Sequence, residues 1–151
     1  SGGLGTMGFG MGAAMGAQVG TGERTVLITG DGSFGMNLNE LATAVAHKIP
    51  MVILLLNNGV LGMVRQWQTL FFDKHYSNTM LDKRQTDFVK LAESYNCDGI
   101  RVTNEDEMRA AFERAKGNTN KPTVIEFAIS CEYDVYPMVP GGKALTDMMF
   151  G

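Results

Sequence analysis

The pattern of apolar positions along the chain predicts alternating strands and helices. Two short apolar runs, residues 25–29 and 51–56, are each followed by a polar cluster. The apolar residues between them recur at i, i+3, i+4 and i+7: Leu38, Leu41, Ala42 and Val45. This spacing predicts one face of a helix that ends before Pro50. A strand, a helix and a second strand form a β-α-β unit, whose parallel strands end at the same side of a sheet.

The rest of the chain continues this alternation. Residues 8–19 predict a helix of small residues that can lie close to a neighbour, and strands are expected at 99–102 and 123–129. Three more helices are indicated by apolar residues at helical spacing: Val60, Val64, Trp67 and Phe71; Phe88, Leu91, Ala92 and Tyr95; and Met108, Ala111, Phe112 and Ala115. The last of these helices follows a Thr103-x-x-Asp106 capping box. The expected fold is therefore α/β, with three layers in which helices cover both faces of a mostly parallel sheet.

The length of 151 residues suits one domain with its own core. We expect residues 1–132 to form this domain and residues 133–151, with two prolines and paired glycines, to form an irregular C-terminal arm. Ser1 opens directly into a glycine-rich segment. The chain is therefore expected to be a fragment of a longer protein.

Composition narrows the range of partners. The net charge is −3, from 13 basic and 16 acidic residues, which argues against nucleic-acid binding. The longest apolar run, residues 51–56, is far too short to cross a membrane. Neither nucleic acid nor a membrane is thus an expected partner. Cys97 and Cys131 have no spacing typical of metal ligands, which favours a reducing compartment such as the cytosol.

Polar residues follow both strands of the β-α-β unit. Gly30-Asp31-Gly32-Ser33 follows the first strand, and Asn57-Asn58-Gly59 follows the second. Either cluster alone is more typical of a structural turn. Together they bring a carboxylate and a carboxamide to one side of the sheet, beside glycines that free backbone N–H groups. This combination predicts a site for Mg²⁺ carrying a diphosphate, because Mg²⁺ prefers hard oxygen ligands and completes its octahedron with phosphate oxygens and water.

A dinucleotide-binding fingerprint is the rival interpretation, because Gly30-x-Gly32-x-x-Gly35 also stands between a strand and a helix. The acidic residue that would hold a ribose hydroxyl after the second strand is absent, since an asparagine pair stands there. Asp31 would also repel a pyrophosphate unless a cation lay between them. The metal-diphosphate interpretation explains Asp31 and is preferred.

The two polar clusters resemble the signature of thiamine-diphosphate enzymes. Three flanking segments narrow the resemblance to the catalytic large subunit of the acetolactate synthase (acetohydroxyacid synthase) family: residues 2–10 (GGLGTMGFG), 61–68 (LGMVRQWQ) and 136–142 (YPMVPGG). The resemblance runs over essentially the whole chain and corresponds to the last third of such a subunit. It implies the decarboxylative condensation of pyruvate with pyruvate or 2-oxobutyrate, a transferase reaction of branched-chain amino-acid biosynthesis.

The resemblance also implies cofactors and partners. Thiamine diphosphate and Mg²⁺ would bind here, whereas FAD would lie mostly on a domain outside this chain. The family forms a homodimer or homotetramer through its thiamine-binding domains, and a regulatory small subunit is left open. The implied location is the cytoplasm in a bacterium or an organelle in a eukaryote.

Residue roles carried over from the family define a predicted cofactor site. Asp31, the side-chain oxygen of Asn58 and the carbonyl of Val60 would bind Mg²⁺. The residues expected to contact the cofactor are Gly5, Met7, Gly30, Asp31, Gly32, Ser33, Asn58 and Met63. The Gly5 carbonyl would accept a hydrogen bond from the exocyclic amine, and Met7 would hold the cofactor bent. The alternative for Met7 is a core methionine.

Arg65, Trp67 and Phe71 match positions that line the substrate channel in the family. The residue pattern alone leaves two other interpretations open. Trp67 shares a helical stripe with Val64 and Phe71, which is equally typical of a core aromatic residue. Arg65 would then be a solvated side chain.

Two departures from the family pattern qualify the resemblance. Thiamine enzymes use a glutamate against the aminopyrimidine ring, and in this family that residue belongs to another domain. No residue here matches it, so no catalytic residue is assigned in this chain and the chain alone is expected to be inactive. Glu40, on the diphosphate side, is a poor substitute. Gly12 stands where relatives usually carry proline, which loosens a helix start without removing a cofactor contact.

Two alternatives to acetolactate synthase remain. One is another thiamine-diphosphate enzyme, of the 2-oxo acid decarboxylase or pyruvate oxidase type. The other is a non-catalytic cofactor-binding subunit.

Overall fold

A four-stranded parallel sheet organises the chain in the computed structural model, which describes residues 3–151. The strands are β1 (Val26–Gly30), β2 (Val52–Asn57), β3 (Asp98–Val102) and β4 (Thr123–Ala128), in the spatial order β1-β2-β4-β3. Val26 pairs with Val52, and Thr123 pairs with both Val52 and Asp98. The strands therefore start level with one another, and the loops that follow them emerge together at one end of the sheet.

Within residues 3–151, six helices and two short 3-10 segments complete the fold. The helices are α1 (Phe9–Thr21), α2 (Asp31–Asn37), α3 (Glu40–Ala46), α4 (Gly62–Phe71), α5 (Phe88–Ser94) and α6 (Glu105–Gly117). The 3-10 segments are η1 (Asp82–Arg84) and η2 (Leu145–Asp147). No helix in residues 3–151 is both long and apolar enough to cross a membrane.

Two hydrophobic clusters lie on opposite faces of the sheet, which confirms the three-layer α/β fold. Side chains of α1, α2, α3 and α5 pack on one face, around Leu41, Ile53 and Phe88. Side chains of α6 pack on the other face, around Ala111 and Ile125. The second face is covered less completely, because the alternate side chains of β1 on that side are largely exposed.

The predicted helix before Pro50 is divided in the structure. It begins at Asp31 and tightens between α2 and α3, where Leu41 N–H donates to the Leu38 carbonyl at 3.1 Å. The face toward the core is as predicted for Leu38, Leu41 and Val45, but Ala42 is exposed. The predicted position of Ala42 in the buried stripe is therefore wrong.

The N-terminal cap of α6 lies one residue later than the predicted Thr103-x-x-Asp106 box. Asn104 is the cap residue, and its side chain accepts a hydrogen bond from Glu107 N–H at 3.0 Å. The Glu107 carboxylate in turn accepts bonds from the backbone N–H and the hydroxyl of Thr103. Thr103 thus takes part, but as the residue before the cap, and Asp106 is not the reciprocal partner.

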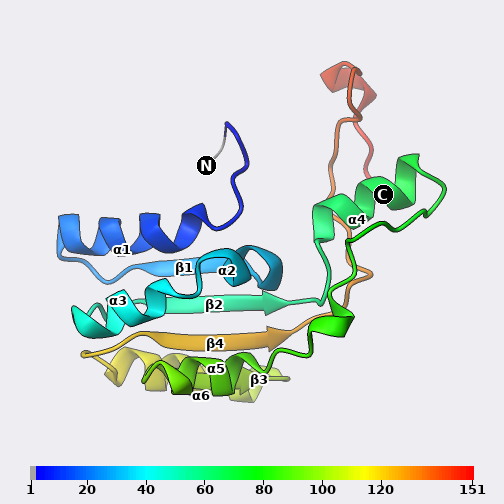
Figure 1. Ribbon diagram of the computed structural model, residues 1–151. Helices are drawn as coiled ribbons and strands as arrows, with labels where there is room; N and C mark the ends of the chain where they lie inside the picture. The colour runs from blue at the N-terminus through cyan, green and yellow to red at the C-terminus, as the bar shows by residue number, and fades with distance from the viewer. Residues whose placement is uncertain (1–2) are drawn as a thin grey trace.

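Helix α4 stands apart from the sheet together with the C-terminal arm. In Figure 1 both rise from the end of the sheet toward which the arrowheads of β2 and β4 point. Gln66 is the buried residue of α4, and its side-chain amide bonds in both directions with the backbone of Val135, at 3.0 and 2.9 Å. The arm folds back on itself through a bridge between Met138 and Met149. Polar contacts to the arm, and from Gln68 to the segment after the helix, hold α4 in place of a hydrophobic core.

Cys97 and Cys131 should differ in reactivity. Cys97 is 3% exposed, and burial raises the pKa of its thiol to about 11. Because the thiolate is the reactive form, a disulfide reagent such as DTNB at pH 8 should modify Cys131, which is partly exposed, before Cys97. Cys131→Ser should abolish the fast phase and Cys97→Ser should leave it intact. Two fast-reacting thiols in the folded protein would contradict this assignment.

Candidate functional site

The first part of the site is the turn from β1 into α2. Gly30 is still extended, with ψ 160°, and the helix starts at Asp31, so the Asp31 side chain leaves from the end of the strand. Asp31 is only 1% exposed. Its Oδ2 accepts a hydrogen bond from Nη2 of Arg84 at 2.7 Å, whereas its buried Oδ1 has no partner in the described structure. Burial raises the pKa of Asp31, and the positive charge of Arg84 and the nearby backbone N–H groups of Asp31 and Gly32 oppose that rise.

The second part is the loop after β2. Oδ1 of Asn58 accepts a hydrogen bond from Val60 N–H at 3.2 Å, an Asx turn that fixes the side chain against its own loop. Gly59 has φ +67°, a conformation that favours glycine. The Asn58 amide nitrogen also lies near Gly62, where an added Cβ would approach it to 3.3 Å. The sequence of this loop, with glycines at positions 59 and 62, thus fixes the position of the Asn58 carboxamide.

The two parts meet because β1 and β2 are neighbours in register, with Gly30 opposite Leu56. They form a cleft of about 200 Å³. Its lining contains nearly all of the predicted cofactor and metal residues: Met7, Gly30, Asp31, Gly32, Ser33, Asn58, Val60 and Met63, together with Leu61, Gly62 and Val64. Gly5 lies outside this lining, in the exposed loop before α1, with φ +60°.

Gly32 keeps the cleft open. A Cβ at this position would lie 2.6 Å from Cδ2 of Leu61 and 3.3 Å from Cε of Met7. The Met7 side chain therefore reaches across the turn from the N-terminal loop, and it is 36% exposed. The alternative that Met7 is a core methionine is wrong, since it lies at the mouth of the cleft.

The N-terminal loop is tied to α2 by hydrogen bonds at Gly8. The Gly8 N–H donates to Oγ of Ser33 at 2.9 Å, and Nδ2 of Asn37 donates to the Gly8 carbonyl at 3.1 Å. These contacts hold Met7 beside the cleft. Gly2, the first residue of the motif at residues 2–10, lies outside the described residues.

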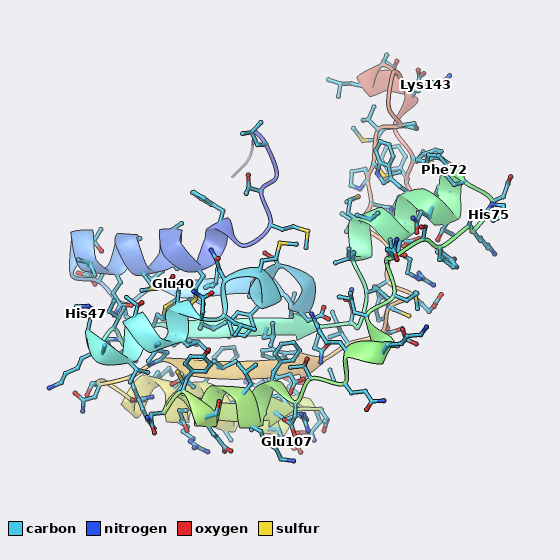
Figure 2. The ribbon with its side chains drawn as sticks, viewed as in Figure 1. Glu40, His47, Phe72, His75, Glu107 and Lys143 are labelled. Carbon is cyan, nitrogen blue, oxygen red and sulfur yellow. The ribbon has the colours of Figure 1, made fainter. Side chains whose placement is uncertain are left out.

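A second, more apolar cavity of about 740 Å³ lies along α4. Its lining consists of Met63, Val64, Trp67, Gln68, Phe71, Phe72, Asp73, His75 and Ser77. Met63 and Val64 line both cavities, so the second adjoins the cleft. Trp67 and Phe71 meet edge to face, with ring centroids 5.5 Å apart. Figure 2 shows Phe72 and His75 at the far end of α4, away from the sheet.

Trp67 is 39% exposed and belongs to neither hydrophobic cluster. The interpretation of the Val64, Trp67 and Phe71 stripe as part of the core is therefore wrong. Helix α4 is amphipathic as predicted, but its apolar side faces a cavity because α4 does not pack on the sheet.

Arg65 lies apart from Trp67 and Phe71. Its guanidinium donates to the Cys131 carbonyl at 3.0 Å and to Glu132 at 2.8 Å, and it lies 5.2 Å from the centre of the Tyr76 ring. The interpretation of Arg65 as a freely solvated side chain is wrong. The structure does not bring Arg65 into the cavity either, because these contacts turn it toward the arm.

Sequence reasoning missed a polar network beneath the asparagine pair. Glu126 is buried in the middle of β4, and its carboxylate accepts hydrogen bonds from Nδ2 of Asn57 at 2.7 Å and Nε of Arg101 at 2.9 Å. Arg101 also pairs with Asp87, the N-terminal cap of α5. A lone glutamate inside an apolar strand was the available signal, since such a group needs a partner.

Arg84 was also missed, because it lies in a segment with no clear periodicity. Arg84 binds one oxygen of the Asp31 carboxylate, and the other oxygen has no hydrogen-bond partner. No group of three His, Cys, Asp or Glu side chains in residues 3–151 is arranged to hold a metal. One carboxylate oxygen from Asp31 and one carboxamide oxygen from Asn58 fit a hard cation that takes its remaining ligands from a phosphate. The space over Gly32 can receive that phosphate.

Glu40 is the first residue of α3 and His47 follows its last, and Figure 2 shows both toward the end of the molecule opposite α4. The Glu40 carboxylate accepts a hydrogen bond from the Thr43 hydroxyl at 2.8 Å. It does not line the cleft, in agreement with its rejection as a substitute for the missing glutamate.

These features define a class of protein. Residues 1–127 match the C-terminal TPP-binding domain of thiamine pyrophosphate enzymes, and the chain belongs to that family. A solved structure of a thiamine diphosphate-dependent 4-hydroxybenzoylformate decarboxylase from Rhodococcus jostii RHA1 superposes with a TM-score of 0.76 and 33% identity. It covers 82% of this chain and 23% of its own.

Within this family, the resemblance to acetolactate synthase large subunits is confirmed. The chain is 45% identical to the large subunit from Corynebacterium glutamicum, over 99% of this chain and 25% of that protein. It is 44% identical to the isozyme 2 large subunit from Escherichia coli, over 99% of this chain and 27% of that protein. The chain thus spans about a quarter of the length of these relatives.

Removing the arginine that neutralises Glu126 should destabilise the fold. Arg101→Met leaves a buried carboxylate with one neutral donor, and we expect a loss of about 1–3 kcal/mol in the free energy of unfolding, because Arg101 is itself half exposed. Urea denaturation measures this loss. Arg109→Met, which breaks an exposed pair with Glu105 on α6, is the matched control and should change little. Equal effects of the two substitutions would argue against the network.

Proposed function

We propose that this chain is the diphosphate-binding part of an acetolactate synthase large subunit. The observation that carries the proposal is the buried Asp31 carboxylate, with one oxygen held by Arg84 and the other without a partner, in a cleft that also contains Asn58. A Mg²⁺ ion bound to thiamine diphosphate would satisfy that oxygen. Asp31, Asn58 and the carbonyl of Val60 are its proposed protein ligands.

The chain's own residues bind and orient the cofactor in this proposal. Backbone N–H groups of Gly32 and Ser33, in the first turn of α2, donate to phosphate oxygens. Gly30 and Met63 form the sides of the cleft, Met7 would support the cofactor there, and the Gly5 carbonyl would accept a hydrogen bond from the cofactor's exocyclic amine. Oδ1 of Asn58, which accepts the Val60 N–H, has a second lone pair with which it would hold the metal. Thiamine diphosphate supplies the electron sink for decarboxylation of a 2-oxo acid.

The cavity along α4 is the proposed route and acceptor site for pyruvate and 2-oxobutyrate. Its apolar lining around Trp67 and Phe71 would receive the alkyl end of the acceptor. Arg65, in contrast, is proposed to hold the arm against α4 and thereby shape this cavity. The overall reaction is the condensation of two 2-oxo acids with loss of carbon dioxide.

Other components of the reaction are proposed to lie outside this chain. These are the glutamate that activates the cofactor, the FAD-binding domain and the second subunit of a homodimer or homotetramer. The proposal leaves a regulatory small subunit open and places the protein in the cytoplasm of a bacterium or in an organelle of a eukaryote. The bacterial relatives named above are consistent with it.

A 2-oxo acid decarboxylase is the second candidate, because the superposed Rhodococcus structure is named as one. The identity of this chain to that protein is 33%, against 45% to the Corynebacterium acetolactate synthase, which favours the synthase. The products from pyruvate alone distinguish the two enzymes: acetolactate for the synthase and acetaldehyde for the decarboxylase.

The metal assignment predicts the effect of Asp31→Ala. This substitution should abolish the Mg²⁺-dependent part of thiamine diphosphate binding, measured by isothermal titration calorimetry with and without EDTA. Asp98→Ala is the matched control, because Asp98 is also paired with an arginine but lies at the opposite end of the sheet. Thiamine diphosphate binding that is unchanged both by EDTA and by the loss of the Asp31 carboxylate would refute the metal assignment.

Trp67 should influence the choice of acceptor. Its flat apolar face can pack on the extra methyl group of 2-oxobutyrate, a contact worth roughly 1–3 kcal/mol. Trp67→Leu should therefore lower the preference for 2-oxobutyrate over pyruvate by a factor of about 10 or more. Competition between the two acceptors in the active protein measures this ratio.

Tyr133→Leu, in the exposed part of the arm, is the control and should leave the ratio unchanged. Thermal stability should change little in Trp67→Leu, since the side chain is partly exposed. A well-folded Trp67→Leu enzyme with the original product ratio would remove Trp67 from the acceptor site.

A further inference from the structure

The segment from Thr79 to Arg84 links the two halves of the cleft. Leu61 N–H donates to the Thr79 carbonyl at 2.8 Å, and Leu81 N–H donates to the Gly59 carbonyl at 2.7 Å. Between these bonds, Met80 forms an antiparallel bridge with Val60. The segment is therefore fixed to the loop that carries Asn58, and its last residue, Arg84, reaches the Asp31 turn.

Arg84 makes two hydrogen bonds to Asp31. Nη2 donates to the side-chain Oδ2 at 2.7 Å, and Nη1 donates to the Asp31 main-chain carbonyl at 3.3 Å. One contact fixes the carboxylate and the other fixes the backbone from which it projects. A charge-assisted hydrogen bond from a planar guanidinium is short and directional, so it sets orientation as well as charge.

The guanidinium is itself held in place. It lies 5.2 Å from the centre of the Phe88 ring, within the range of a cation–π contact. Gly35 leaves the space that it occupies, since a Cβ there would come within 3.1 Å of Nη1. The Arg84 backbone N–H donates to the Leu81 carbonyl at 3.0 Å. Arg84 is thus a placed side chain, although its own exposure is about a third.

Asp31 stands between two cavities. Arg84 lines a pocket of about 180 Å³ with Asp31, Asn57 and Phe88, whereas the diphosphate cleft contains Asp31 but not Arg84. The arginine therefore approaches the carboxylate from outside the cleft. A cation in the cleft does not have to displace it in order to reach the buried oxygen that lacks a partner.

We propose that Arg84 is a positioning residue for the metal: it holds one oxygen of Asp31 and the Asp31 backbone, so that the other oxygen is presented to a divalent cation in the cleft. This inference rests on the proposed function of the cleft. Together with its segment, Arg84 also sets the separation between Asp31 and Asn58, because that segment is bonded to both loops.

The charge balance adds a second consequence. Asp31 is the only acidic side chain among the described residues that line the cleft, and Arg84 neutralises it. The protein alone thus offers a cation no net negative charge there. The diphosphate must supply it, and reciprocal linkage then requires that Mg²⁺ and diphosphate strengthen each other's binding.

The test compares Arg84→Met, Arg84→Lys, Asp31→Asn and wild type in the whole protein. Thiamine diphosphate is titrated at several Mg²⁺ concentrations, and Mn²⁺ binding is followed by electron paramagnetic resonance. Arg84→Met should weaken the apparent affinity for the metal by roughly 10- to 100-fold, the usual effect of losing a group that orients a metal ligand. Arg84→Lys should recover part of this loss, because it keeps the charge without the two-point grip.

Two controls separate a positioning role from a general loss of stability. Arg24→Met removes an arginine that donates to three carbonyls at the C-terminal end of α6, far from the cleft, and should leave the metal affinity unchanged. Thermal unfolding in EDTA identifies any variant that fails to fold. Wild type should also bind Mn²⁺ weakly without diphosphate and tightly with it.

The outcomes are distinguishable. If Asp31→Asn abolishes metal-dependent binding and both Arg84 variants keep wild-type affinity, the positioning role is wrong and the metal site stands. A tighter site in Arg84→Met would also overturn it, because charge competition would then outweigh orientation. If wild type shows no metal-dependent diphosphate binding, the proposed function fails and the role of Arg84 fails with it.

Discussion

The parallel pairing of β1 with β2 is the contact on which the other features of the site depend. Its register sets Gly30 opposite Leu56, so the next residues of both strands leave the sheet side by side. A shift by one residue would turn every inward side chain of β1 outward and would separate Asp31 from Asn58. The buried face of this pair, including Leu27, Ile53 and Leu55, specifies the register because each of these side chains must face the same core.

Burial of Asp31 creates a demand that the surrounding residues meet only in part. A carboxylate removed from water is costly unless it is paired and hydrogen-bonded. Arg84 satisfies one oxygen, and the other remains a buried acceptor. By comparison, Glu126 has partners on both oxygens, Asn57 and Arg101. The two buried carboxylates near this end of the sheet therefore differ in kind. Both carboxylate oxygens of Glu126 are hydrogen-bonded within the fold, whereas one oxygen of Asp31 has no hydrogen-bond partner, which is the property expected of a metal ligand.

The sequence was sufficient for those parts of the fold that local periodicity controls. The four strands, the core faces of α5 and α6 and the meeting of Asp31 with Asn58 follow from apolar spacing and the β-α-β rule. Contacts between distant segments were not accessible in this way. Arg84 approaches Asp31 across 53 positions of the chain, and Glu126 reaches Asn57 across 69. The periodicity of the sequence around Arg84 and Glu126 does not indicate which distant residue either of them contacts.

Helix α4 shows why an amphipathic pattern alone cannot separate a core face from the face of a cavity. Val64, Trp67 and Phe71 have the spacing of a buried stripe, yet all three are at least partly exposed. The difference lies on the opposite side of the helix, where Gln66 is buried against Val135 and Arg65 binds the Cys131 carbonyl and Glu132. Polar residues that would be solvated on an ordinary surface helix are here the ones that anchor it. With that side fixed to the arm, the apolar stripe is left to form the wall of the cavity beside the cleft.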